Sequence, residues 1–139
     1  MNLFNPVPFD PGRGALALTL LRLVLAGLIA AHGWARLLSD GVVPFGGFLD
    51  QVGFPLGFWI AAGITALEIL GTPLLAWGRL VLPLTLAYAF IYVMGIVLVH
   101  AQAGWFVVGL GRNGAEYSVL LISCLLLVGA QHWPRKAAE

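Results

Sequence analysis

Four long apolar runs, separated by short segments rich in glycine, proline and charge, organise the chain. They cover about residues 15–38, 57–78, 81–101 and 114–133. Each run is close to the roughly 20 residues that a helix needs to cross a bilayer. Because the connections are short, consecutive helices should be antiparallel neighbours. The pattern therefore predicts an all-α fold: an integral membrane four-helix bundle with up-down-up-down topology in a single domain.

The segments outside the apolar runs are less regular. Residues 1–14 hold three prolines and two glycines and predict an N-terminal arm, while residues 134–139 predict a C-terminal tail. Residues 39–56 are too polar and too broken to span a bilayer. Within them, the stretch FGGFLDQVGF is amphipathic, which is typical of a short helix lying in the membrane interface. We expect this helix between the first and second spanning helices.

Composition supports a membrane protein and narrows its chemistry. The chain is 60% hydrophobic and only 9% charged, whereas a soluble domain carries roughly 25% charged residues. A net charge of +1 provides no basic face, so nucleic acid is not an expected partner. The single cysteine, Cys124, offers no second thiol for disulfide exchange and is interpreted as a packing residue.

Basic residues beside the apolar runs predict the orientation in the membrane. The basic residues on the side of the chain termini are Arg13, Arg79, Arg135 and Lys136. The charged residues on the other side are Arg36, Arg112, Asp40 and Asp50. The positive-inside rule then places both termini in the cytoplasm. All five tryptophans fall at helix ends, where membrane interfaces favour them.

The first run carries charge inside an apolar helix. At 100° per residue, Arg22, His32 and Arg36 share one stripe, which must face protein or water because a charge in lipid costs a few kcal/mol at least. Side chains tilt toward the N-terminus of their helix. The first helix runs outward and the second inward, so the side-chain ends of His32 and Glu68 should lie at about the same depth in the membrane. Arg36 leans toward the same point. For Arg22 we weigh a contact with Tyr88 against extension to the interface.

Glu68 is the least ordinary residue of the second run. Thr65 and Thr72 lie three residues before and four residues after it, on the same helix face. Pro73 cannot donate to the carbonyl of Ile69, which opens the helix locally. We interpret Glu68 as a proton carrier or an acceptor for a ligand head group; the alternative is a neutral hydrogen-bonding link between helices.

Glu116 begins the fourth run, where the positive end of the helix dipole favours a carboxylate. Arg36, His100 and Arg112 are its candidate partners, and helix capping alone is the alternative. The ligand-binding or proton-relay candidates are therefore His32, Arg36, Glu68, Glu116, His100 and Arg112. The expected structural polar residues are Arg22, Tyr88, Thr65 and Thr72. No spacing of histidines and carboxylates predicts a metal site.

Several short motifs follow one another in a recognisable order. They are LLR at Leu20–Arg22, HGWARL at His32–Leu37, FGGFLDQVGFP at Phe45–Pro55, ALEILG at Ala66–Gly71 and GAEYSVLLI at Gly114–Ile122. In this order the chain resembles the DoxX family of small four-helix bacterial and archaeal membrane proteins. Arg36 stands where many relatives carry lysine, which keeps the charge but not the geometry.

This resemblance implies a multi-pass protein of the bacterial or archaeal cytoplasmic (inner) membrane. Several relatives are associated with redox systems, as subunits of quinol-oxidising or thiosulfate:quinone oxidoreductase complexes or as membrane partners of redox enzymes. Quinone is therefore the candidate cofactor or ligand. The expected partners are the lipid bilayer and, as candidates, a redox enzyme or further copies of this chain.

Three functions remain open from the sequence. The first is a redox-associated subunit with a quinone or lipid-like ligand site in the outer half of the bundle. The second is a non-enzymatic membrane anchor or assembly partner for another protein, which small size and a lone cysteine favour. The third is a small-solute transporter coupled to protons through Glu68, which would need several copies because four helices leave little room for a pore.

Overall fold

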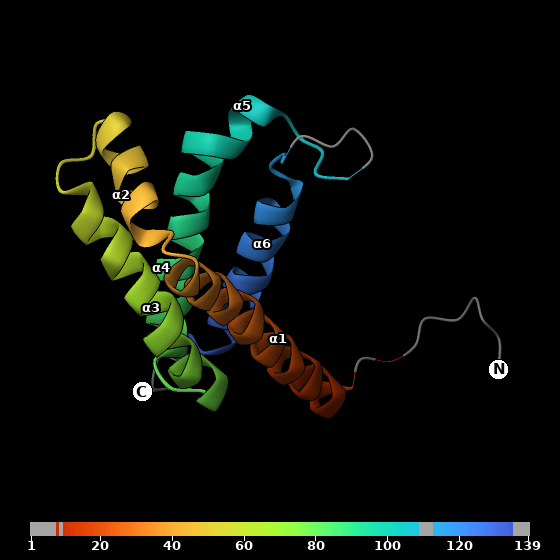
Figure 1. Ribbon diagram of the computed structural model, residues 1–139. Coiled ribbons are helices and arrows are strands. Elements are labelled where there is room, and N and C mark those ends of the chain that lie inside the picture. Colours follow the sequence, from red (N-terminus) through yellow and green to blue (C-terminus); the bar gives the residue numbers. More distant parts are fainter. Residues whose placement is uncertain (1–7, 9, 109–112, 135–139) are drawn as a thin grey trace.

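The computed structural model describes residue 8, residues 10–108 and residues 113–134, and these residues form helices and no strand. The helices are α1 (Pro11–Leu38), α2 (Val42–Gln51), α3 (Gly57–Trp77), α4 (Val81–Gly95), the π-helical turn η1 (Ile96–His100), α5 (Ala101–Ala103) and α6 (Glu116–Gln131), as Figure 1 shows. The prediction of an all-helical fold is confirmed for this part of the chain.

Within the described residues, three helices are long and apolar enough to cross a membrane. They are α1, α3 and the continuous helix Val81–Ala103, which joins α4, η1 and α5. Helix α6 is apolar but has 16 residues, which at ~1.5 Å per residue gives about 24 Å, short of a hydrocarbon core of about 30 Å. The protein is therefore a membrane protein with at least three helices of spanning length.

Helix α1 begins at Pro11, inside the segment that was expected to be an arm. The side chain of Asp10 accepts hydrogen bonds from the backbone N–H groups of Gly12 at 2.9 Å and Arg13 at 3.3 Å. This cap satisfies donors that have no partner within the helix, and proline suits the first helical turn. The N-terminal part of α1 consequently extends away from the other helices (Figure 1).

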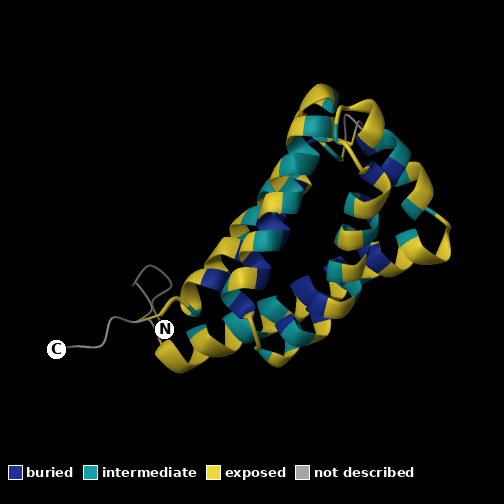
Figure 2. Ribbon diagram, turned by 90° about the vertical axis from the view of Figure 1, so that its left-hand side faces the viewer, coloured by how far each residue is buried: buried dark blue, intermediate teal, exposed yellow. Residues whose placement is uncertain are grey.

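The helices pack in two groups. Helices α1 and α2 both pack extensively on α3, and α4 packs extensively on α6. Between the groups, α1 contacts α6 and a thinner contact joins α3 to α4. Buried positions lie on the inward helix faces and exposed ones outside (Figure 2). The outer faces carry large apolar side chains, including Leu70, Leu86, Leu120 and Leu127, as contact with lipid requires.

The hydrophobic core occupies one end of the molecule, near the connection between α3 and α4. Its buried members include Leu25 and Ile29 of α1, Leu75 of α3, Leu84 and Tyr88 of α4, and Leu125 and Val128 of α6. At this end the Tyr88 hydroxyl donates to the carbonyl of Leu67 at 2.8 Å. A Cβ on Gly71 would collide with that hydroxyl, so glycine permits the bond. Toward the other end, α3 and α4 have no such core between them.

Helix α2 is fastened to the start of α3. The carboxylate of Asp50 accepts a hydrogen bond from the N–H of Gly57 at 2.9 Å. A Cβ on Gly46 would lie 2.6 Å from the Cα of Phe58, so only glycine permits this approach of the two backbones. The aromatic residues of α2 therefore keep a fixed position over α3.

Candidate functional site

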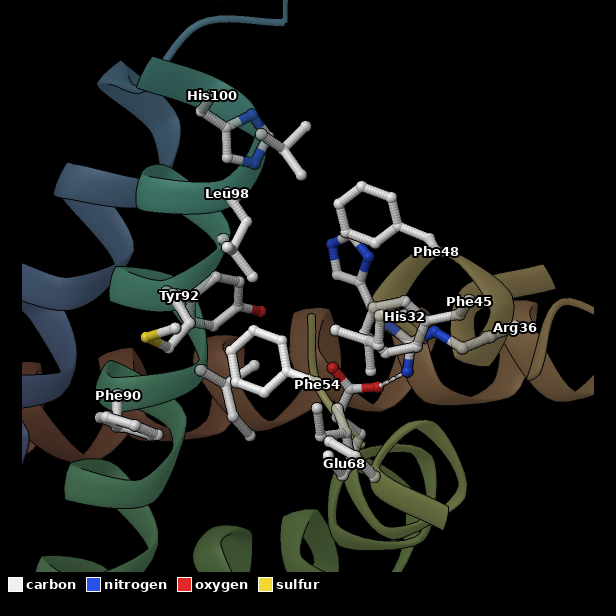
Figure 3. Close-up of a pocket in the computed structure, with 17 residues that line it drawn as sticks. His32, Arg36, Phe45, Phe48, Phe54, Glu68, Phe90, Tyr92, Leu98 and His100 are labelled. Atoms are coloured by element: carbon white, nitrogen blue, oxygen red, sulfur yellow. Dashed lines mark hydrogen bonds and ion pairs between the residues drawn. The ribbon is translucent and has the colours of Figure 1, made fainter. Parts of the chain in front are cut away.

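A cavity of about 310 Å³ lies at the end of the molecule where α3 and α4 separate. One wall comes from α1, α2 and α3, and the other from α4 and η1 (Figure 3). The residues that line it are mostly apolar and aromatic. Among them are Phe45, Phe48, Phe54, Ile60, Ile64, Phe90, Ile91, Met94, Leu98 and Val99. The polar residues in its lining are His32, Arg36, Glu68, Tyr92 and His100.

An ion pair between Arg36 and Glu68 lies in the first wall. Arg36 Nη1 is 2.5 Å from Glu68 Oε2, and the carboxylate side chain is only 5% exposed. The same Nη1 donates to Thr65 Oγ1 at 3.1 Å, and that hydroxyl donates to the carbonyl of Ala61 at 2.8 Å. The guanidinium also lies over the ring of Phe45, with Cζ 4.8 Å from the centroid. The charge of Arg36 is thus compensated on three sides.

Glycine in α1 makes this pair possible. A Cβ on Gly33 would lie 2.8 Å from the Cβ of Glu68 and 3.0 Å from Cγ1 of Ile69, so α1 and α3 touch at this level. Arg36 follows Gly33 by three residues and therefore lies on the same face of α1. Thr65 and Glu68 share a face of α3 by the same spacing. The close approach sets the guanidinium beside the carboxylate.

The opening that Pro73 makes in α3 is filled by a side chain of the same helix. Thr72 Oγ1 donates to the carbonyl of Glu68 at 2.7 Å and lies 3.4 Å from the carbonyl oxygen of Ile69. The carbonyl that proline leaves without its usual donor therefore has a hydroxyl nearby. Thr72 stabilises the backbone under Glu68 and does not line the cavity.

His32 lies in the cavity lining together with Glu68. Its ring is in the open part of the cavity, near Phe48 (Figure 3). No described residue forms a hydrogen bond to it. The partner of Glu68 is Arg36, because the guanidinium leans back along α1 and reaches the carboxylate directly.

Two polar side chains on the α4–η1 wall, Tyr92 and His100, face the Arg36–Glu68 pair across the cavity. Tyr92 Oη is buried and has no hydrogen-bond partner among the described residues, an arrangement that costs about 1–3 kcal/mol. His100 Nδ1 donates to the carbonyl of Asn113 at 2.8 Å. His100 was expected from the sequence, whereas Tyr92 was not. A tyrosine four residues after Tyr88, in the middle of an apolar run, was the available signal.

Other predicted residues lie elsewhere. Glu116 does not line the cavity; its Oε1 accepts hydrogen bonds from the backbone N–H groups of Val107 at 2.8 Å and Val108 at 3.3 Å. It therefore holds the connection that precedes α6. Arg112, one of its candidate partners, lies outside the described residues. Arg36, the other cation, is engaged by Glu68.

Among the described residues Arg22 forms no hydrogen bond with Tyr88, whose hydroxyl donates to the carbonyl of Leu67 in α3. Its Nη1 instead donates to Nε2 of His132 at 3.4 Å, and Nδ1 of His132 donates to the carbonyl of Val128 at 3.0 Å. A Cβ on Gly78 would lie 2.8 Å from the same Nη1. Arg22 therefore lies at the end of the molecule opposite the cavity, between the C-termini of α3 and α6.

Comparison with known proteins gives one match. The family model described as DoxX matches residues 17–101, which is more than half of the 139 residues. The matched region contains every residue of the cavity lining. No curated protein and no solved structure matches the chain. Among the described residues, no three histidine, cysteine or acidic side chains are grouped so as to hold a metal ion.

Proposed function

The chain belongs to the DoxX family, and we propose that it binds an apolar small molecule with a polar head group, of the quinone or lipid-like kind, in the cavity between α1–α3 and α4–η1. The observation that carries the proposal is the Arg36–Glu68 pair, which is buried in protein yet borders an apolar, aromatic-lined space. Ligand sites in proteins are commonly apolar pockets with a few polar groups that fix orientation.

The pair suits a head group rather than an apolar tail. Arg36 donates through a single nitrogen to both Glu68 and Thr65, which leaves other guanidinium N–H groups for a ligand oxygen. Glu68 Oε1 has no partner among the described residues and accepts from a ligand hydroxyl. Phenylalanine rings around the pair exclude water and strengthen these contacts. The remaining lining then accommodates the apolar part of the ligand.

The arrangement in the bilayer is part of the same proposal. Helices α1, α3, α4–α5 and α6 cross the inner membrane up and down with both termini in the cytoplasm, and α2 lies in the outer interface. The shorter α6 spans with local thinning of the bilayer, which a membrane tolerates at modest cost. The cavity is then in the outer half of the membrane, where an apolar ligand enters from lipid, and the protein serves as a redox-associated subunit or accessory.

Ligand titration of the purified protein tests the proposal. Calorimetry with 2-decyl-1,4-benzoquinone and with 2-decylhydroquinone should give saturable binding to wild-type protein in detergent micelles. Glu68→Gln should weaken binding of at least one of them by about tenfold or more, because a charge-assisted hydrogen bond is lost. Glu116→Gln is the matched control, since that carboxylate is outside the cavity. Absence of binding, or equal binding by both variants, contradicts the proposal.

A membrane anchor or assembly partner is the second candidate, and one observation favours it. The N-terminal part of α1 leaves the other helices and exposes Leu16 and Leu20 by more than half. A partner helix packing there would bury this surface. Isolation of the tagged protein should then yield a stoichiometric partner whose yield falls for Leu16→Gln/Leu20→Gln. Isolation of the chain alone under mild detergent would contradict this second function.

A further inference from the structure

We propose that His100 and Tyr92 form a second polar subsite, on the cavity wall opposite the Arg36–Glu68 pair, which binds a hydroxyl group of the ligand. This inference rests on the proposed function and names the chemical class of its head group.

The π-helical turn η1 directs His100 into the cavity. The helix is α-helical to Gly95 and π-helical over the next five residues, Ile96–His100. In an α-helix, residues five apart are about 140° apart around the axis and do not meet. Here a Cβ on Gly95 would lie 3.9 Å from Cδ2 and 4.0 Å from Nε2 of His100. The wider turn brings the imidazole back over Gly95, onto the helix face that lines the cavity.

The hydrogen bond to Asn113 fixes the role of the imidazole. A carbonyl oxygen only accepts, so Nδ1, which is 2.8 Å from it, carries the proton. In the neutral ring Nε2 then bears the lone pair and acts as an acceptor. No described residue forms a hydrogen bond to Nε2. The subsite therefore presents Nε2 as an acceptor, in an orientation that is fixed by the hydrogen bond from Nδ1 to Asn113.

Tyr92 supplies the complementary donor. Its hydroxyl is buried, has no partner among the described residues, and points toward the middle of the cavity (Figure 3). A ligand hydroxyl donates to His100 Nε2, and Tyr92 Oη donates to a further oxygen of the same head group. A ketone or ether oxygen only accepts and leaves Nε2 without a donor. The ligand is thus a hydroxyl-bearing molecule, either a phenol such as a quinol or an aliphatic alcohol such as a diacylglycerol.

Four probes separate these chemistries. Binding to the whole protein in detergent is measured by calorimetry for 2-decylhydroquinone, its dimethyl ether, 2-decyl-1,4-benzoquinone and dioctanoylglycerol. The hydroquinone or dioctanoylglycerol should bind at least about tenfold more tightly than the ether, which has no hydroxyl to donate. Which of the two binds identifies the source of the hydroxyl. Equal affinity for the ether and both hydroxyl compounds would overturn the proposal.

Variants test the two residues separately. His100→Asn keeps a donor for the Asn113 carbonyl and removes the Nε2 acceptor, and Tyr92→Phe removes only the hydroxyl. His100→Asn should weaken binding of the preferred hydroxyl probe by about tenfold and leave binding of the ether unchanged. Tyr92→Phe should weaken binding of both, because an ether oxygen also accepts from the Tyr92 hydroxyl. His132→Asn and Tyr117→Phe are matched controls outside the cavity lining and should bind as wild type does.

The two proposals fail in different ways. If Glu68→Gln loses binding while His100→Asn and Tyr92→Phe keep it, the second subsite is wrong and the proposed function stands. If wild-type protein binds none of the four probes, both are wrong. A thermal unfolding transition measured for each variant confirms that a loss of binding reflects the subsite and not the fold.

Discussion

Two arginines of the same helix are accommodated in different ways. Arg22 and Arg36 lie fourteen residues apart on α1, close to four full turns, so both point toward the neighbouring helices. Arg36 meets the carboxylate of Glu68 and borders the cavity. Arg22 has no carboxylate within ion-pair distance among the described residues. It lies beside Gly78, which ends α3, and His132, which ends α6.

The difference shows two sources of negative potential inside a membrane protein. Helix C-termini carry about half a negative charge from carbonyl groups that lack intrahelical donors. Arg22 lies beside two such termini and donates to His132, while its buried Nε has no partner among the described residues. Arg36 depends on one particular side chain. Substitutions should therefore be more harmful around Arg36 than around Arg22, and the four predictions that follow test this order.

Arg36→Gln should have the largest effect. It leaves Glu68 buried without its counter-charge, which costs about 3–5 kcal/mol for a buried pair. The free energy of unfolding in detergent micelles, from a denaturant titration, measures it. The double variant Arg36→Gln/Glu68→Gln should recover part of the loss, because no buried charge is then left without its partner. Equal losses in the single and double variants would mean that the pair is not coupled.

Gly33→Ala should come next, with a loss of up to about 3 kcal/mol from overpacking. The new Cβ would lie 2.8 Å from the Cβ of Glu68, so α1 and α3 must separate at the ion pair. Gly27→Ala on the same helix is the control, since nothing lies within 4 Å of its Cβ. That control should gain up to about 1 kcal/mol from helix propensity. Similar unfolding free energies for the two variants would contradict the close contact.

Gly78→Ala tests the region of Arg22 and should cost about 2 kcal/mol. Its φ of +81° is unfavourable for alanine, and the new Cβ would lie 2.8 Å from Arg22 Nη1. Gly53→Ala isolates the backbone term, because Gly53 has φ +94° and open space around its Cβ. We expect about 1 kcal/mol for that control. Thermal unfolding of both variants in one detergent makes the comparison, and an equal loss would show that Arg22 moves aside freely.

Arg22→Gln should have the smallest effect, about 1 kcal/mol, because it strands no opposite charge and removes one long hydrogen bond to His132. A denaturant titration in detergent micelles, as for Arg36→Gln, measures the free energy of unfolding. A loss as large as that of Arg36→Gln would overturn the comparison, since helix termini would then bind a guanidinium as strongly as a carboxylate does.

The apolar runs predicted most of the fold. Runs of spanning length gave α1, α3 and the Val81–Ala103 helix, because in lipid every backbone group must be satisfied within the helix. The start of α1 was missed because Asp10 acts through its side chain, which hydropathy does not register. The fourth run is shorter as a helix than as a sequence pattern, since Gly114 and Ala115 belong to the turn that precedes Glu116.

For the candidate site, the sequence indicated the wall of α1 and α3, and on the wall of α4 and η1 it indicated His100 but not Tyr92. Depth and side-chain tilt brought His32, Arg36 and Glu68 to one level, although they did not distinguish which cation pairs with the carboxylate. The second wall depends on η1, and counting at 100° per residue fails where the backbone forms a π turn. The environment of Arg22 required knowing that α1 packs against both α3 and α6, which no local pattern encodes.

The Arg36–Glu68 pair also imposes an order on biosynthesis. Glu68 follows Arg36 by 32 residues, so at about 5–20 residues per second the ribosome takes roughly 2–6 s to deliver the acid after the base. During that interval we expect the guanidinium of α1 to remain in contact with water or with the insertion machinery. We therefore expect α1 to complete its insertion only when α3 arrives with the carboxylate of Glu68.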